Sequence, residues 1–123
     1  MTQSMTMKNI DKAPMVGGCW DLPDLGTGTE VLTDSAEVTV LATTGNDASV
    51  PRHVHAHHDE FGLLVQGRGR VFIGDETHEV RPGSTWAIPR GVPHGGEYDG
   101  EFRVLVWFTP GEDLADPDRI TLA

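Results

Sequence analysis

Short apolar runs, most of them ended by a glycine or a proline, follow one another along this chain. The pattern predicts strands of four to eight residues, over 30–33, 38–43, 51–55, 61–66, 68–73, 77–80, 85–88 and 102–109. Turns are expected at 45–47, 74–76 and 81–83, and a further short turn is expected at 113–115 in the tail. No window carries the periodic stripe of an amphipathic helix. The chain is therefore predicted to be all-β, as a barrel or a double-sheet jelly roll.

Two of these strands carry apolar side chains on both faces. Within 61–65 and 104–108, apolar residues occupy both alternating sets of positions, which point to opposite sides of a sheet. A small barrel standing alone would keep one of these faces polar. We expect the outer face to be covered by the N-terminal segment or, as we prefer, by a second copy of the chain in a homodimer.

Composition and charge limit the classes of function. The 123 residues suit one domain with a modest core. A formal net charge of -10 disfavours nucleic acid and an anionic membrane surface as partners. Residues 1–14 lack the apolar segment of a signal peptide. They also show no strand or heptad pattern, so we expect a flexible arm there and a single domain over 15–123. The one cysteine, Cys19, excludes an internal disulfide and fits a cytoplasmic location.

Four residues are candidate ligands of a metal ion: His53, His55, Glu60 and His94. His53 and His55 are two positions apart, so on a strand they point to the same face. Glu60 begins the next strand, and a closing barrel would bring His94 opposite the others. Three imidazoles and one carboxylate suit a divalent transition ion such as iron, manganese, nickel, copper or zinc. Four protein ligands would leave a coordination position open, as catalytic metal sites do.

The spacing of these residues resembles the first sequence motif of the cupin superfamily. That motif reads G-x5-H-x-H-x3,4-E-x6-G, and the chain matches it from His53 through Glu60 to Gly67. Its leading glycine is off register, because Asp47 occupies the expected place. Gly67 ends a predicted strand, where we expect a positive φ.

A second stretch resembles the second cupin motif, G-x5-P-x-G-x2-H-x3-N. The chain matches it from Gly83 to His94, with Tyr98 in place of the closing asparagine. The resemblance covers about residues 38–109, typical of small single-domain microbial cupins. It implies a cupin-type double-stranded β-helix, which is a jelly-roll barrel. It also implies that residues 38–109 form the metal-binding core, with the four candidate ligands on one divalent metal ion.

The resemblance leaves three classes of function open. The first is a metal-dependent enzyme acting on a small organic substrate, most simply a dioxygenase-type oxidoreductase, in which Glu60 could also leave the metal and act as a base. The second is an isomerase, lyase or polyketide cyclase that works by proton transfer without redox chemistry. The third is a non-catalytic cupin that binds a small molecule.

Candidate substrate-binding residues lie around the ligands. Tyr98 follows the last ligand by four positions and could reach the pocket, and Arg90 beside the entrance could hold a substrate carboxylate. His57 could act as a base at the pocket mouth, although it and His58 are more typical of solvated loop residues. Trp86 could stack on a substrate, although a core or interface role is more usual for a tryptophan.

Overall fold

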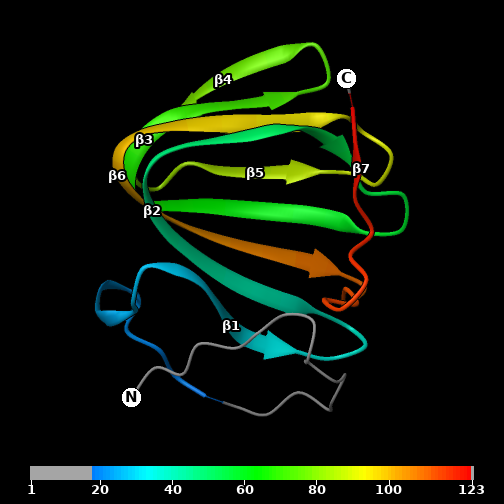
Figure 1. The fold of residues 1–123 in the computed structure, drawn as a ribbon, viewed down its shortest axis with the longest axis horizontal. Coiled ribbons are helices and arrows are strands. Elements are labelled where there is room, and N and C mark those ends of the chain that lie inside the picture. The colour runs from blue at the N-terminus through cyan, green and yellow to red at the C-terminus, as the bar shows by residue number, and fades with distance from the viewer. Residues whose placement is uncertain (1–17, 123) are drawn as a thin grey trace.

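A computed structural model describes residues 18–122, which fold into a β-barrel (Figure 1). The strands are β1 (Gly28–Asp34), β2 (Thr39–Val54), β3 (Asp59–Ile73), β4 (Glu76–Val80), β5 (Thr85–Ile88), β6 (His94–Thr109) and β7 (Ile120–Thr121). The one helical element in this part is a 3-10 turn, η2 (Leu22–Asp24), and no helix here is long and apolar enough to cross a membrane. The all-β prediction is confirmed, while the flexible arm expected over 1–14 lies outside the described residues.

One antiparallel sheet in the order β1-β2-β6-β3-β4 wraps around the interior to form the jelly roll. The long strand β6 pairs with β2 on one side and with β3 on the other. β3 also pairs with β5 near its start and with β4 near its end, so its two ends have different neighbours. β7 pairs with the end of β2, where the C-terminal segment runs across one end of the barrel (Figure 1).

Several predicted strands are pieces of longer ones. The segments 38–43 and 51–55 join into β2, so the turn expected at 45–47 is wrong. The register with β6 shifts between Asn46 and Ala48, and Asp47 takes a φ of 52°. This is a β-bulge, which absorbs an extra residue without ending the strand. Asp47 has a positive φ, a conformation that glycine adopts readily and aspartate tolerates. This explains why Asp47 can occupy the position where the cupin motif has a glycine.

A second irregularity joins 61–66 and 68–73 into β3. The register with β6 shifts on both sides of Gln66, and Gly67 has the positive φ that was expected, 95°. β6 begins at His94 rather than at 102. The prediction missed its first half because Gly95, Gly96 and Gly100 interrupt the apolar pattern of a strand there. The strand over 85–88 is confirmed, and turns lie at 74–75 and 82–83, within the ranges expected at 74–76 and 81–83.

Apolar side chains from the inner faces of the strands form the core. Leu64 is fully buried, Val104 is nearly so, and the rings of Tyr98 and Phe102 stack with centroids 4.5 Å apart. The outer face is also apolar, since Phe61 and Trp107 stack there at 5.8 Å and are only half-buried. The expectation of apolar residues on both faces is therefore confirmed for the strands that carry these rings.

Candidate metal centre

The four candidate ligands meet inside the barrel, although they come from three separate parts of the sheet. His53, near the end of β2, stands opposite His94, the first residue of β6. Glu60 is the second residue of β3, and His55 follows directly after β2. One possible ligand atom from each of the four lies within 4.8 Å of those of the others. The three histidines are buried, and the side chain of Glu60 is 12% exposed.

Backbone carbonyls orient the three imidazole rings. The Nδ1 atoms of His53 and His94 lie 2.7 and 3.0 Å from the carbonyl oxygen two residues earlier in each case. Nδ1 of His55 bonds to the carbonyl oxygen of Asp118. A carbonyl oxygen can only accept, so each Nδ1 carries a hydrogen, and Nε2 is the nitrogen of each ring that is left to bind a metal ion. This arrangement is the one that metal-binding histidines use.

The Nε2 atoms of His55 and His94 converge on the carboxylate of Glu60. Its Oε1 lies 3.1 Å from Nε2 of His55 and 3.3 Å from Nε2 of His94. The contact with His94 lacks hydrogen-bond geometry, so that buried nitrogen has no hydrogen-bond partner among the described residues. Buried polar atoms normally have a partner. A divalent cation bound by these four side chains would supply one, so the donor set fits a metal ion.

The protonation states also suit a cation. Burial lowers the pKa of His53 to about 4, with smaller contributions from His94 and Arg119. Burial alone would raise the pKa of Glu60, but the imidazoles of His55 and His94 lower it to about 2. At neutral pH the carboxylate is therefore ionised and the His53 ring is neutral, which are the forms that bind metals. Burial alone would lower the pKa of His55. The bonds to Glu60 and to the Asp118 carbonyl outweigh burial, so the pKa of His55 is raised.

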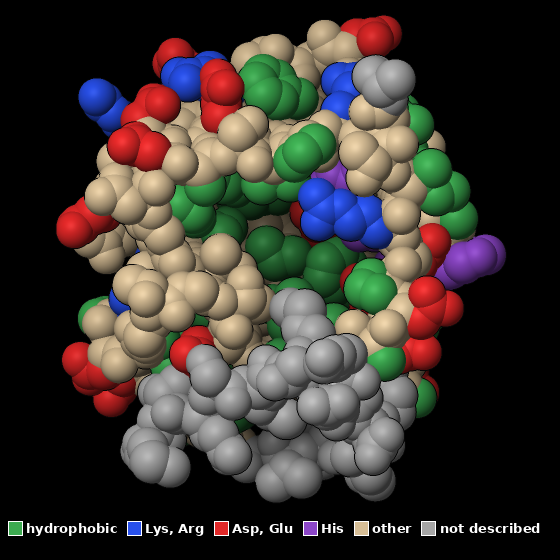
Figure 2. All heavy atoms as spheres, viewed as in Figure 1, with side chains coloured by type: hydrophobic (Ala, Val, Ile, Leu, Met, Phe, Trp, Pro, Cys, Tyr) green, Lys and Arg blue, Asp and Glu red, His purple; other side chains and the backbone are tan. Residues whose placement is uncertain are grey.

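A cavity of about 350 Å³ opens beside the four residues, at the lower end of the size range of small-molecule sites. Its walls are mostly apolar, from Leu41, Val71, Ile88, Val104, Val106 and Phe108 among others. Figure 2 shows the hollow, with hydrophobic side chains in its depth and histidine and basic side chains at its edge. A small molecule with an apolar body could therefore lie against the candidate metal centre.

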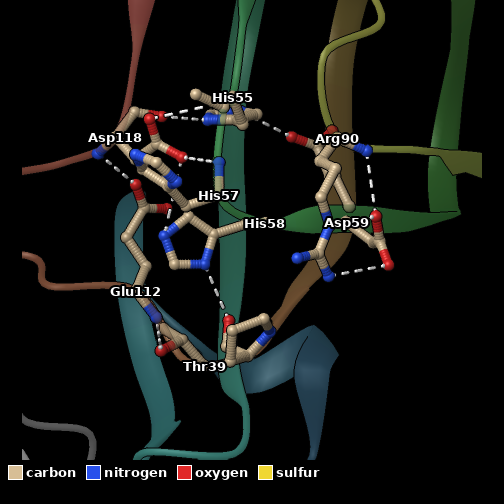
Figure 3. Close-up of polar contacts among 11 residues, drawn as sticks. Thr39, His55, His57, His58, Asp59, Arg90, Glu112 and Asp118 are labelled. Carbon is tan, nitrogen blue, oxygen red and sulfur yellow. Dashed lines mark hydrogen bonds and ion pairs between the residues drawn. The ribbon is translucent and has the colours of Figure 1, made fainter.

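The candidate substrate-binding residues divide into two groups. Trp86 and Tyr98 line the cavity, and burial raises the pKa of Tyr98 to about 12. Arg90 does not line the cavity, because its guanidinium turns to Asp59, with Nε 3.2 Å from Oδ1 (Figure 3). His57 is exposed, and it is also absent from the cavity wall.

The neighbouring His58 corrects one expectation. It is buried rather than solvated, and its Nδ1 lies 2.8 Å from the carbonyl oxygen of Pro110 (Figure 3). The link between the ligands is therefore packed against the segment that follows β6.

We call this C-terminal segment, residues 110–122, the strap, and its part in the site was not predicted from the sequence. The carboxylate of Asp118 accepts the backbone N–H groups of Ala56, at 3.1 Å, and His57. The N–H of Asp118 donates to Oε1 of Glu112 at 2.8 Å (Figure 3). Glu112 and Arg119 both line the cavity. No local pattern in a short acidic tail indicates the contacts with Ala56 and His57, which lie 62 and 61 positions away from Asp118.

Comparison with known proteins agrees with this geometry. The sequence model described as "Cupin domain" matches residues 40–108. An uncharacterized protein of Aquifex aeolicus (strain VF5) is 29% identical over 112 residues, covering 83% of this chain and 92% of that protein.

Solved structures show the same fold. KdgF from a Halomonas species has a TM-score of 0.66 at 23% identity, covering 69% of this chain and 79% of its own. The DMSP lyase DddQ from Ruegeria pomeroyi DSS-3 has a TM-score of 0.59 at 21% identity, covering 67% and 46%. At these identities the likeness concerns the fold alone.

Proposed function

The chain belongs to the cupin family, and from this membership and its buried donor set we propose that it is a metal-dependent enzyme acting on a small organic molecule. One observation carries the proposal: Nε2 of His94 is buried without a hydrogen-bond partner among the described residues, next to the Glu60 carboxylate and two further imidazoles. The donors face an apolar cavity rather than a closed core. An open face is typical of a catalytic rather than a structural metal site.

The roles of the four donors follow from their surroundings. His53, His55 and His94 would hold the ion through Nε2, and Glu60 through a carboxylate oxygen. Bound there, a divalent ion would act as a Lewis acid on a substrate oxygen and, if redox-active, would pass electrons between substrate and oxygen. With a pKa of about 2, Glu60 stays ionised and is a weak base. Its charge therefore supports a role as ligand over the role of a detachable base.

A dioxygenase-type reaction is the first candidate. In such a reaction both atoms of O2 enter the organic substrate, so no external reductant is consumed. The apolar walls support this choice, because they would take up an apolar substrate together with O2 and exclude water.

Proton-transfer chemistry is the second candidate, and Tyr98 favours it. The phenol lines the cavity, and with a pKa of about 12 it remains protonated at neutral pH. It could therefore donate a hydrogen bond to a substrate oxygen and stabilise the negative charge that develops there in an isomerase, lyase or cyclase reaction.

Separate loading of the protein with Fe(II), Mn(II), Ni(II), Cu(II) or Zn(II) would test these proposals. Each form is incubated with phenolic and diketone compounds under air and under nitrogen, and oxygen uptake and product mass are followed. A dioxygenase takes up O2 with a redox-active metal and places both atoms of isotopically labelled O2 in the product. Turnover under nitrogen with zinc that is lost in Tyr98→Phe supports proton transfer. Saturable binding without product under either gas would contradict an enzyme.

A further inference from the structure

The strap places a cation at the mouth of the cavity. Among residues 18–122, Arg119 is the one Lys or Arg that lines the cavity. It is exposed, and within this part of the chain the structure pairs no carboxylate with its guanidinium. Arg90 and Arg70 differ, because each forms ion pairs with carboxylates, at 3.2 Å and 2.7 Å for the shortest contacts. The donors of Arg119 are therefore available to a ligand in the cavity.

The backbone on both sides of Arg119 is fixed. On one side, the carboxylate of Asp118 accepts two backbone N–H groups from the link after β2. On the other side, β7 pairs with the end of β2, where Thr121 stands opposite His53. The N–H of Leu122 donates to the carbonyl oxygen of Arg52 at 2.8 Å. Arg119 is thus held at a fixed place near the metal ligands rather than on a free tail.

The charge of the protein makes this single cation informative. The formal net charge is -10, and Glu60 and Glu112 line the same cavity. An anionic ligand would be repelled by this field unless a positive group met it at the entrance. Guanidinium groups bind carboxylates through two parallel hydrogen bonds, a geometry that lysine cannot reproduce.

We propose that Arg119 is the anion-binding residue of this cavity, and that the ligand is a small carboxylic acid whose apolar body fills the barrel. Its carboxylate meets the guanidinium at the mouth, and its other end points toward the four donors. That this ligand is a substrate rests on the proposed function. Its recognition by Arg119 does not, because it needs no metal ion.

Titrations of metal-free protein test the inference directly. The probes are phenylacetate and hexanoate, each compared with its neutral amide, phenylacetamide and hexanamide. Binding is followed by NMR at the Nε–H signal of Arg119 and the indole signal of Trp86. We expect each carboxylate to bind about tenfold more tightly than its amide, with a preference that shrinks as salt is added.

Variants assign the preference to one side chain. Arg119→Gln should weaken carboxylate binding about tenfold and leave amide binding unchanged, while Arg119→Lys should keep part of the preference. Arg90→Gln is the matched control, because it removes the same charge from the same end of the barrel and should change nothing. Unshifted amide signals of His53 and Val54 show that β7 is still paired in each variant.

Three results would overturn the inference: equal affinities for carboxylate and amide, no saturable binding of any probe, or a preference that survives Arg119→Gln. Failure of the proposed function looks different. A protein that binds no metal but still prefers carboxylates through Arg119 contradicts the enzyme and keeps the inference. A metal-loaded, active protein that shows no preference for carboxylates supports the enzyme and contradicts the inference about Arg119.

Discussion

The carbonyl oxygen of Asp118 accepts a hydrogen bond from Nδ1 of His55, across 63 positions of the chain. Through this bond the strap orients a candidate metal ligand, and the next residue, Arg119, reaches the cavity. The metal centre and the cavity mouth are therefore coupled through one short segment. Disturbing the strap should affect both.

Replacing Asp118 by alanine tests this coupling. The variant loses the carboxylate that holds two backbone N–H groups, so we expect a free energy of unfolding lower by about 1–2 kcal/mol. Looser support of His55 should weaken metal binding by roughly tenfold. Hydrogen exchange at the Leu122 amide, which bonds to the Arg52 carbonyl, measures detachment of the strap. Asp116→Ala, on the same exposed tail, is the control, and equal protection in both variants would refute the coupling.

The stability of the metal-free protein should depend on pH through His53. Its pKa is about 4 in the folded state against 6.5 ordinarily, so between these values the unfolded chain takes up a proton that the folded protein refuses. This residue should lower stability by about 2–3 kcal/mol as the pH falls through this window, offset in part by His55, whose raised pKa acts in the opposite direction. Urea unfolding at stepped pH values measures this change. A His53→Gln variant should show a smaller decline, and equal slopes would mean that another group is responsible.

Gly62 makes room for Trp86 on the wall of the cavity. A Cβ atom at position 62 would lie 2.1 Å from Cε2 of the indole, which is a rigid ring. We expect Gly62→Ala to cost roughly 1–3 kcal/mol of unfolding free energy, because the ring must move into the cavity. In a Trp86→Leu background the same change should cost much less. Gly26→Ala, where the nearest atom is 3.6 Å away, is the control.

The outer apolar face predicts a homodimer. Phe61 stacks on Trp107 there, and Leu63 stands opposite Leu105 on the neighbouring strand. These side chains are half-buried in the single chain, and a second copy would cover them. Sedimentation should give a dimer, and Trp107→Glu should give a folded monomer that still binds metal. A wild-type protein that stays monomeric at high concentration would contradict this prediction.

The sequence predicted the barrel and the four donors, but it did not predict where strands run through irregular positions. Bulges and turns use the same residue types, so the glycine, asparagine and aspartate at 45–47 indicated a turn. In the structure Asp47 adopts a φ of 52° within β2, and its carboxylate accepts the N–H of Gly100 at 2.7 Å. That bond comes from a distant strand, and no local pattern reveals it.

The same limit applies to the cavity mouth. Arg90 is close in sequence to the last ligand, which made it the natural candidate for a substrate carboxylate. Folding places Asp59 beside Arg90, and the strap brings Arg119 to the cavity instead. The two-residue spacing predicted that His53 and His55 meet, and they do, although His55 lies one residue past the end of β2. The Arg90–Asp59 ion pair and the position of Arg119 depend on how distant segments meet when the barrel closes, and no spacing in the sequence indicates them.

Elemental analysis of the protein, purified without added metal or a chelating column, tests the proposed metal centre. We predict about one equivalent of a divalent transition ion per chain. Almost all of it should be lost in His55→Ala and retained in His78→Ala, whose imidazole is exposed on β4. No metal even after reconstitution, or full stoichiometry in His55→Ala, would contradict the proposed centre.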